Sequence, residues 1–181
     1  VQHMDSLVGV LRKKIEALPF GGDINLIVTS DHGMTDISPE RAVNINDYVK
    51  PEWCEVIDGR TPTSIFSKPE YRDSICNALK KAAHIRVWKK EEIPAELHYG
   101  SSDRIGDIVV APELGWQFTD VARDTKGAHG YFPQSPDMQV MFRAIGPDFK
   151  RGYISEGFVN VDIYPLLSHL LQIVPEKTDG R

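Results

Sequence analysis

The chain has 181 residues, of which 41% are hydrophobic and 26% are charged, and its formal net charge is -5. This balance is ordinary for a globular domain with a core, and it excludes the collagen-like, disordered and low-complexity classes. Lys and Arg are scattered along the chain, so the basic stripe of a nucleic-acid-binding surface is missing. No apolar run approaches the ~20 residues of a membrane-spanning helix. Because the basic residues are scattered, we expect an anionic substrate to be bound by a local group such as a metal ion.

The N-terminal segment predicts a helix followed by a buried strand. Apolar residues recur at helical spacing from Val1 to Leu18, and Pro19 ends the pattern. The segment 24–30 is short and rich in branched side chains, which predicts a strand. A polar cluster at residues 31–36 follows it directly. Val1 starts inside the helical pattern without the features of a signal peptide, which suggests a trimmed fragment.

The middle of the chain predicts a second structural layer, separate from the main sheet. Residues 55–58 and 63–67 favour two short strands, residues 70–83 a helix, and residues 85–88 a half-buried strand. This order is typical of a small α+β insertion, at approximately residues 52–100, packed beside the main sheet.

Strand character returns in the C-terminal part. Residues 107–111, 115–118 and 140–145 predict strands, and residues 127–131 form a glycine-flanked loop. A helix is expected at residues 161–173. Helix–strand alternation at both ends of the chain predicts an α/β layered sheet.

The chain has two cysteines, Cys54 and Cys76, which are too few for a disulfide framework. One bridge remains possible, but two separate buried thiols are favoured because free cysteine behaves as a small buried hydrophobe.

The candidate functional residues lie directly after the predicted strand 24–30 and in the glycine-flanked loop 127–131. Asp31 and His32 follow a strand directly, and Gly33 lets the backbone turn so that both side chains can converge. His129 lies in a loop that has no periodic reason to hold an imidazole. Zinc binds imidazole nitrogen and carboxylate oxygen readily. Each feature alone is more often a cap or a packed or solvated histidine, so the inference depends on their combination.

Five segments in order resemble the type I phosphodiesterase/nucleotide pyrophosphatase family of the alkaline phosphatase superfamily. They are residues 25–34, 104–109 and 126–131, then residues 136–138 with Phe142, Gly146, Pro147, Phe149 and Lys150, and finally residues 160–167 with Pro175 and Gly180. The resemblance implies a layered α/β sheet of the alkaline-phosphatase-like type that is incomplete here. Residues 1–181 would then be a single partial catalytic domain, similar to the C-terminal half of the family's domain.

The resemblance also implies a site with two zinc ions. Asp31 and His32 would ligate the zinc that activates the nucleophile, and His129 would ligate the other zinc. Tyr131, beside His129, is a candidate for substrate binding. The implied substrate is a small phosphodiester or nucleotide, and the implied location is extracellular or periplasmic.

The chain departs from the family pattern in one respect. The family's Thr or Ser nucleophile and its further Asp and Asp-x-x-x-His ligands have no counterpart here, so the catalytic nucleophile is unknown. Because a catalytic zinc ordinarily has three protein ligands, we expect this chain alone to be inactive and its parent to be the hydrolase. Two alternatives stay open: another two-metal phosphoryl or sulfuryl hydrolase of the superfamily, and a non-catalytic domain with a degenerate site.

Overall fold

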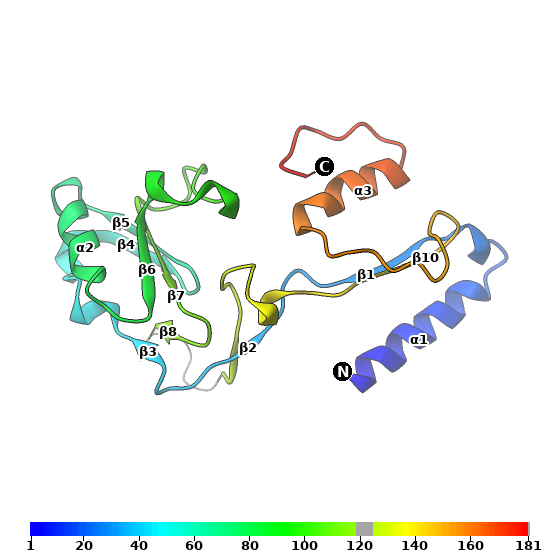
Figure 1. The fold of residues 1–181 in the computed structure, drawn as a ribbon, viewed down its shortest axis with the longest axis horizontal. Helices are drawn as coiled ribbons and strands as arrows, with labels where there is room; N and C mark the ends of the chain where they lie inside the picture. The colour runs from blue at the N-terminus through cyan, green and yellow to red at the C-terminus, as the bar shows by residue number, and fades with distance from the viewer. Residues whose placement is uncertain (119–124, 181) are drawn as a thin grey trace. The chain divides into compact units, whose positions relative to one another are not determined.

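The computed structural model describes residues 1–118 and 125–180, and the chain divides into two compact units. The first unit comprises Val1–Asp31 and Val140–Arg181, and the second comprises His32–Gln139. Figure 1 shows the first unit in the blue and orange-to-red colours and the second in cyan to yellow.

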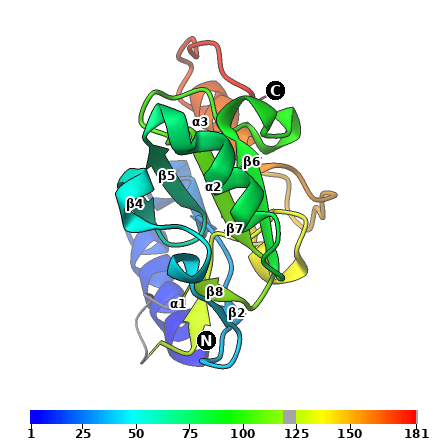
Figure 2. The same ribbon diagram turned by 90° about the vertical axis from the view of Figure 1, so that its left-hand side faces the viewer.

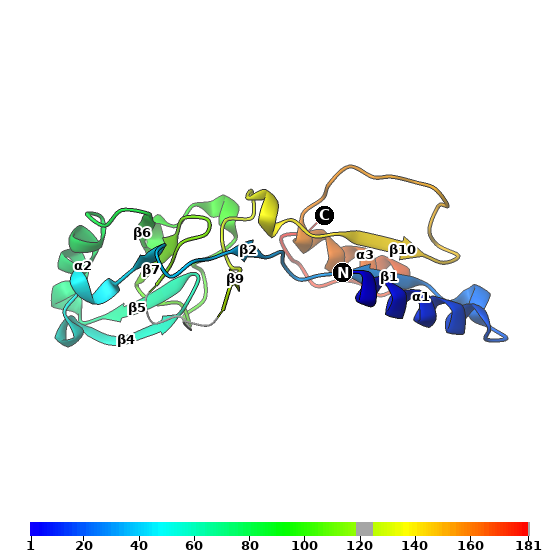
Figure 3. The ribbon, with the colours of Figure 1, turned by 90° about the horizontal axis from the view of Figure 1, so that it is seen from below.

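The first unit contains two helices and a two-stranded ladder. Its helices are α1 (Gln2–Glu16) and α3 (Ile163–Leu170), and its strands are β1 (Leu26–Thr29) and β10 (Phe142–Ile145). The two strands are antiparallel, with Leu26 opposite Ile145 and Thr29 opposite Phe142 (Figure 3). The predicted strands at 24–30 and 140–145 are therefore present, and the predicted C-terminal helix is shorter than expected.

Little of the first unit is buried. Helix α1 has no buried residue, and its apolar side chains Met4, Leu7 and Leu11 are 63%, 49% and 47% exposed. Strand β1 is half-buried rather than buried as expected. A fully buried strand needs neighbours on both edges and cover on both faces, whereas the described part of the chain pairs β1 with β10 alone.

The second unit is built on a four-stranded antiparallel sheet. Its strands are β4 (Cys54–Gly59), β5 (Thr63–Ser67), β7 (Ile108–Pro112) and β6 (Ile85–Lys89), in the order β4-β5-β7-β6. Helix α2 (Arg72–Leu79) lies over this sheet (Figure 2). The core between them contains fully buried apolar side chains from both layers: Ile65, Ile75, Leu79, Ile108 and Val110.

The predicted insertion at residues 52–100 falls within this second unit. Its two strands, helix and third strand all form, but β7 at residues 108–112 joins the same sheet between β5 and β6. The boundaries of the insertion and the single-domain description stay predictions.

Two smaller ladders and several short helices complete the described residues. Strand β2 (Thr35–Asp36) is antiparallel to β9 (Gly127–Ala128), and β3 (Ala42–Val43) is parallel to β8 (Gln117–Phe118). The expected loop at 127–131 therefore begins as a strand. Short 3₁₀ helices are η1 (Gly21–Asp23), η2 (Ile45–Asp47), η3 (Pro51–Trp53), η4 (Pro69–Tyr71), η5 (Lys90–Glu92), η6 (Ala95–Leu97), η7 (Pro136–Met138) and η8 (Asn160–Asp162).

The structure also describes the state of the two cysteines and the character of the helices. Cys54 and Cys76 are free thiols, as favoured from the sequence, and burial raises the pKa of both. Over residues 1–118 and 125–180, the helices are too short or too polar for any of them to span a membrane.

Candidate active site

Asp31 and His32 follow strand β1 closely in the chain. β1 ends at Thr29, whose hydroxyl donates a hydrogen bond to the carbonyl oxygen of Met141 at 3.0 Å. The Ser30 hydroxyl then donates to Oδ1 of Asp31 at 3.4 Å. Asp31 is the last residue of this part of the first unit and His32 is the first residue of the second.

The structure brings His32 and His129 together, although 97 residues separate them in the sequence. Their imidazole rings stack with centroids 3.5 Å apart and an interplanar angle of 12°. Both histidines belong to the second unit. The two predicted residues therefore lie next to each other in the structure, and their role as metal ligands stays a prediction.

A backbone contact defines the tautomer of His32. Its Nδ1 lies 2.8 Å from the carbonyl oxygen of Gly33. A carbonyl oxygen can only accept, so Nδ1 carries the proton and donates. Nε2 then holds the in-plane lone pair, and this is the arrangement that metal-ligating histidines adopt when a carbonyl orients their other nitrogen.

Hydrogen bonds between two chain segments hold the histidines in place. β2 pairs with β9, so Thr35 lies opposite Ala128. The Gly33 amide donates to the carbonyl oxygen of Met138 at 3.2 Å. The buried Thr35 hydroxyl donates to Oδ2 of Asp137 at 2.6 Å. The segment after His32 is therefore hydrogen-bonded both to residues 127–128, before His129, and to residues 137–138, after it.

Two glycines are required by close backbone approaches at this site. A Cβ on Gly33 would lie 1.9 Å from the carbonyl oxygen of Asp137. Gly130 has φ of +90°, and a Cβ there would lie 1.9 Å from the carbonyl oxygen of Thr61. Any larger residue would force the backbone apart at these two points.

Tyr131 lies in a small core rather than on an open surface. It is 7% exposed and packs with Ile37 and Met138. Its hydroxyl donates to the carbonyl oxygen of Trp116 at 2.7 Å, and burial raises the pKa of that hydroxyl. In this position Tyr131 fixes the His129 loop to the core, and its role in substrate binding remains a prediction.

Asp137 is the residue that sequence reasoning passed over. It lay inside a segment that matched the family pattern, but nothing in the sequence pairs it with Thr35, 102 residues away. The tertiary structure brings the two segments together, and only there does Asp137 become the partner of Thr35.

The ring geometry allows a test of the implied zinc ions. A zinc ion lies close to the plane of each imidazole that ligates it, about 2.0–2.1 Å from the nitrogen. One ion shared by two nearly parallel rings would lie far out of both planes, so His32 and His129 fit two separate ions. The nitrogen and oxygen donors of these residues and Asp31 suit zinc.

The count of ligands is low. Across the residues that the structure describes, no group of three His, Cys, Asp or Glu side chains gathers as a metal site would require. Three candidate ligands for two ions fall short of the three protein ligands that a single catalytic zinc ordinarily has.

The fold is α/β of the alkaline-phosphatase-like type, with a paired-histidine site at the end of a strand. The model of the type I phosphodiesterase/nucleotide pyrophosphatase family matches residues 1–132. The chain therefore belongs to that family, as its sequence segments indicated.

Relatives support this assignment over nearly the whole chain. A bis(5'-adenosyl)-triphosphatase from Bos taurus is 34% identical, and ectonucleotide pyrophosphatase/phosphodiesterase family member 5 from Homo sapiens is 33% identical. Each alignment covers 99% of this chain but only 40% and 38% of the relative. The chain thus spans about two fifths of the length of these relatives, so it corresponds to part of their sequence.

Solved structures give the same result. Human ectonucleotide pyrophosphatase/phosphodiesterase 5 matches with a TM-score of 0.90 at 32% identity, covering 99% of this chain and 49% of that one. An inactive form of the murine protein in complex with AMP matches with a TM-score of 0.90 at 34% identity, with the same coverage.

Proposed function

We propose that the intact protein containing this chain hydrolyses phosphodiester or nucleotide pyrophosphate bonds with the help of two zinc ions. The observation that carries the proposal is the parallel stack of His32 on His129, with centroids 3.5 Å apart. Two-metal hydrolases hold their ions ~3.5–4 Å apart, and adjacent parallel imidazoles suit a pair of neighbouring ions.

Each residue has a separate role in this proposal. Asp31 and His32 hold one ion, and His129 holds the other. When bound, the two ions neutralise the charge that builds on the phosphoryl oxygens during displacement. The chain's own contribution is positional: the Gly33 carbonyl orients His32, and the Thr35–Asp137 hydrogen bond keeps the two histidine segments together.

The nucleophile and the remaining ligands belong, in this proposal, to the part of the intact protein outside these 181 residues. The chain alone is then inactive, because it offers fewer ligands than two catalytic zinc ions require. This part of the proposal is supported by the relatives, which are more than twice as long as the matched region.

The proposed substrate is a nucleotide or another small phosphodiester, outside the cytoplasm. AMP is bound to the murine relative, and several relatives are named ectonucleotide pyrophosphatases/phosphodiesterases. Discrete ions at the site make a basic protein surface unnecessary, which agrees with the net charge of -5.

A turnover assay with a nitrophenyl phosphodiester and added zinc tests both parts. The intact protein is expected to hydrolyse the diester, and its His129→Ala variant and the 181-residue chain are expected not to. Robust hydrolysis by the chain alone would contradict the fragment proposal. Absence of diester hydrolysis by the intact protein, with turnover of a monoester or sulfate ester instead, would point to another hydrolase of the superfamily.

A further inference from the structure

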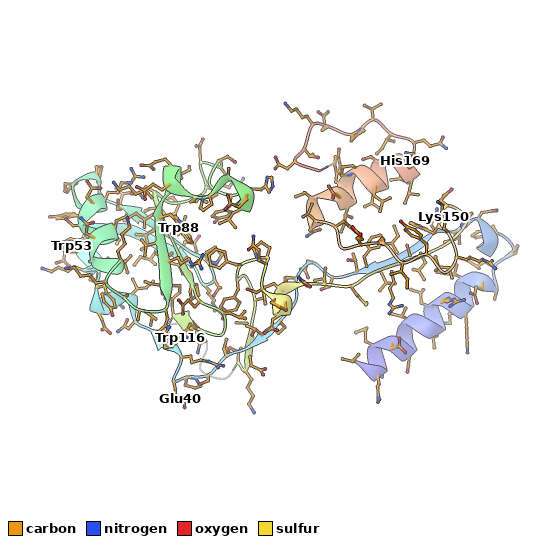
Figure 4. The ribbon with its side chains drawn as sticks, viewed as in Figure 1. Glu40, Trp53, Trp88, Trp116, Lys150 and His169 are labelled. Atoms are coloured by element: carbon orange, nitrogen blue, oxygen red, sulfur yellow. The ribbon has the colours of Figure 1, made fainter. Side chains whose placement is uncertain are left out.

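A large cavity lies in the first unit, at the end of the β1–β10 ladder that is far from Asp31. Its volume is about 820 Å³, and its walls are the C-terminal part of α1, the turn after that helix, the ends of the two strands and the loop at residues 146–153. Figure 4 labels Lys150 in that loop. β1 runs from Leu26, which lines the cavity, to Thr29, so ~10 Å of strand separates the cavity from the segment that carries Asp31.

Hydrogen bonds hold the loop of this cavity against the start of β1. The Asp148 amide donates to Oδ1 of Asn25 at 3.3 Å, and Nδ2 of Asn25 donates back to Oδ2 of Asp148 at 2.6 Å. The Phe149 amide donates to the carbonyl oxygen of Gly146 at 3.3 Å and closes a turn. The Asp148 carboxylate is therefore engaged by Asn25, and the loop is formed before any ligand arrives. A preformed site avoids the entropic cost of ordering a loop on binding.

The rim of the cavity is basic, although the chain as a whole is acidic. Three basic residues line it, namely Arg12, Lys150 and Arg151. Among the described residues that line the cavity, Glu16 is the one carboxylate, and its Oε1 already accepts a hydrogen bond from Nε of Arg12 at 2.7 Å. Three cations and one carboxylate give a local charge of +2, against -5 for the chain. A concave surface of one charge sign concentrates small ions of the opposite sign.

The less exposed part of the lining is apolar. Ile15, Leu26 and Phe149 line the cavity and are half-buried, whereas Lys150 is exposed. The Lys150 ammonium lies 5.8 Å from the centroid of the Tyr153 ring, which also lines the cavity. An apolar floor below a basic rim suits a ligand that has both a carbon frame and negative charge.

We infer that this cavity binds a small organic dianion, with its charged groups at Lys150 and Arg151 and its carbon frame on the apolar floor. The local charge of +2 matches two negative charges, and the volume lies in the range of small-molecule pockets. Carboxylate and phosphate groups supply the same chemistry, because both accept charge-assisted hydrogen bonds from guanidinium and ammonium groups. The site is separate from His32 and His129, so its binding depends neither on zinc nor on the proposed hydrolysis.

Protection of Lys150 from acetylation in the intact protein tests the inference. The protein is kept in EDTA, so that no metal contributes, and is treated briefly with acetic anhydride in the presence or absence of phthalate or phenyl phosphate. Peptide mass spectrometry measures the acetylation of each lysine. Lys13 and Lys14 lie on α1, are exposed and do not line the cavity, so they are the matched controls. A dianion at saturation is expected to lower the acetylation of Lys150 about three-fold or more, with no change at the two controls.

The two dianions distinguish the sources of the charge. Protection by phthalate alone assigns the site to carboxylates, protection by phenyl phosphate alone assigns it to phosphates, and protection by both assigns it to dianions in general. Equal acetylation of Lys150 with and without both dianions overturns the inference. The same protection by benzyl alcohol, or by potassium chloride at equal ionic strength, also overturns it, as does a Lys150 that is not acetylated in the absence of ligand.

Variants with opposite expected signs make the test specific, and calorimetric titration with the protecting dianion measures their affinities. Lys150→Gln removes one rim charge and is expected to weaken binding about two- to five-fold. Glu16→Gln removes the carboxylate and releases Arg12, so binding is expected to strengthen by a similar factor. Lys13→Gln and Asp5→Asn change exposed residues of α1 outside the cavity and should leave the affinity unchanged. Weaker binding in Glu16→Gln, or equal affinity in Lys150→Gln and Lys13→Gln, overturns the inference, whatever the hydrolysis assay gives.

Discussion

The Thr35 hydroxyl donates a hydrogen bond to the Asp137 carboxylate over 2.6 Å, and this bond joins the segment after His32 to the segment after His129. Thr35 is 7% exposed, so its hydroxyl has little access to water as an alternative partner. We infer that the spacing of the His32 and His129 imidazoles depends on this hydrogen bond, whose two residues are not themselves candidate metal ligands.

Replacing Thr35 with valine tests that dependence. The change keeps the shape of the side chain and removes the donor, so the free energy of unfolding should fall by about 1.5–3 kcal/mol, as for one hydrogen bond to a charged group. Urea denaturation measures it. Thr178→Val, at an exposed position near the C-terminus, is the control and should leave stability unchanged. Equal midpoints for both variants would show that the bond does not hold the segments together.

Gly33→Ala is expected to be damaging for a steric reason. The new Cβ would lie 1.9 Å from the carbonyl oxygen of Asp137, so the Gly33–Met138 hydrogen bond and its neighbours must open. Gly9→Ala in α1 meets nothing within 4 Å and should instead stabilise by ~0.5–1 kcal/mol, because glycine is unfavourable inside a helix. Thermal melting compares the two variants. A Gly33→Ala protein as stable as the wild type would contradict the close approach.

Stability should fall at alkaline pH, partly because of Tyr131. Burial raises the pKa of its hydroxyl above the unfolded value of ~10, so the fold favours the neutral phenol. That contribution is fully present below the unfolded pKa and is lost as the pH rises through the folded pKa. The free energy of unfolding should therefore decline more steeply above about pH 10 in the wild type than in Tyr131→Phe. Tyr153→Phe, 70% exposed, is the control and should follow the wild type.

The two cysteines should differ in reactivity. Cys76 is 1% exposed, Cys54 is half-buried, and burial raises the pKa of both thiols, which lowers the thiolate fraction at pH 8. A thiol-reactive dye should label Cys54 first and Cys76 only on unfolding. Recovery of two reactive thiols from the denatured, unreduced chain is expected, and recovery of none would indicate a disulfide.

Sequence patterns predicted the local elements of the second unit well because its periodicity is clear. Strand β5 alternates between buried and half-buried residues, which is the period-two pattern that one buried face imposes. Strand β4 is almost entirely exposed, and its prediction depended on the turn that joins it to β5. Burial in the first unit was harder to predict. The apolar stripe of α1 predicts a helix that covers a core, yet no residue of α1 is buried. Periodicity identifies the apolar face of a helix, but it does not identify the segment that this face packs against.

Only the candidate ligand residues of the site could be singled out from the sequence. Asp31, His32 and His129 are distinctive types beside glycines and could be singled out in the sequence. The Thr35–Asp137 bond and the Tyr131–Trp116 bond could not, because they depend on a tertiary register that brings distant segments together. Tyr131 illustrates the limit, because its proximity to His129 in the sequence suggested substrate contact, whereas its side chain packs in a small core.

The measurement that tests the central claim most directly is the zinc content of the intact protein and of its His32→Ala and His129→Ala variants, determined by elemental analysis after dialysis. Because the stacked rings suit two separate ions, we expect two zinc ions in the wild type and about one in each variant, with a different ion lost in each. Two ions in both variants, or none in either, would contradict the assignment of His32 and His129 to different ions.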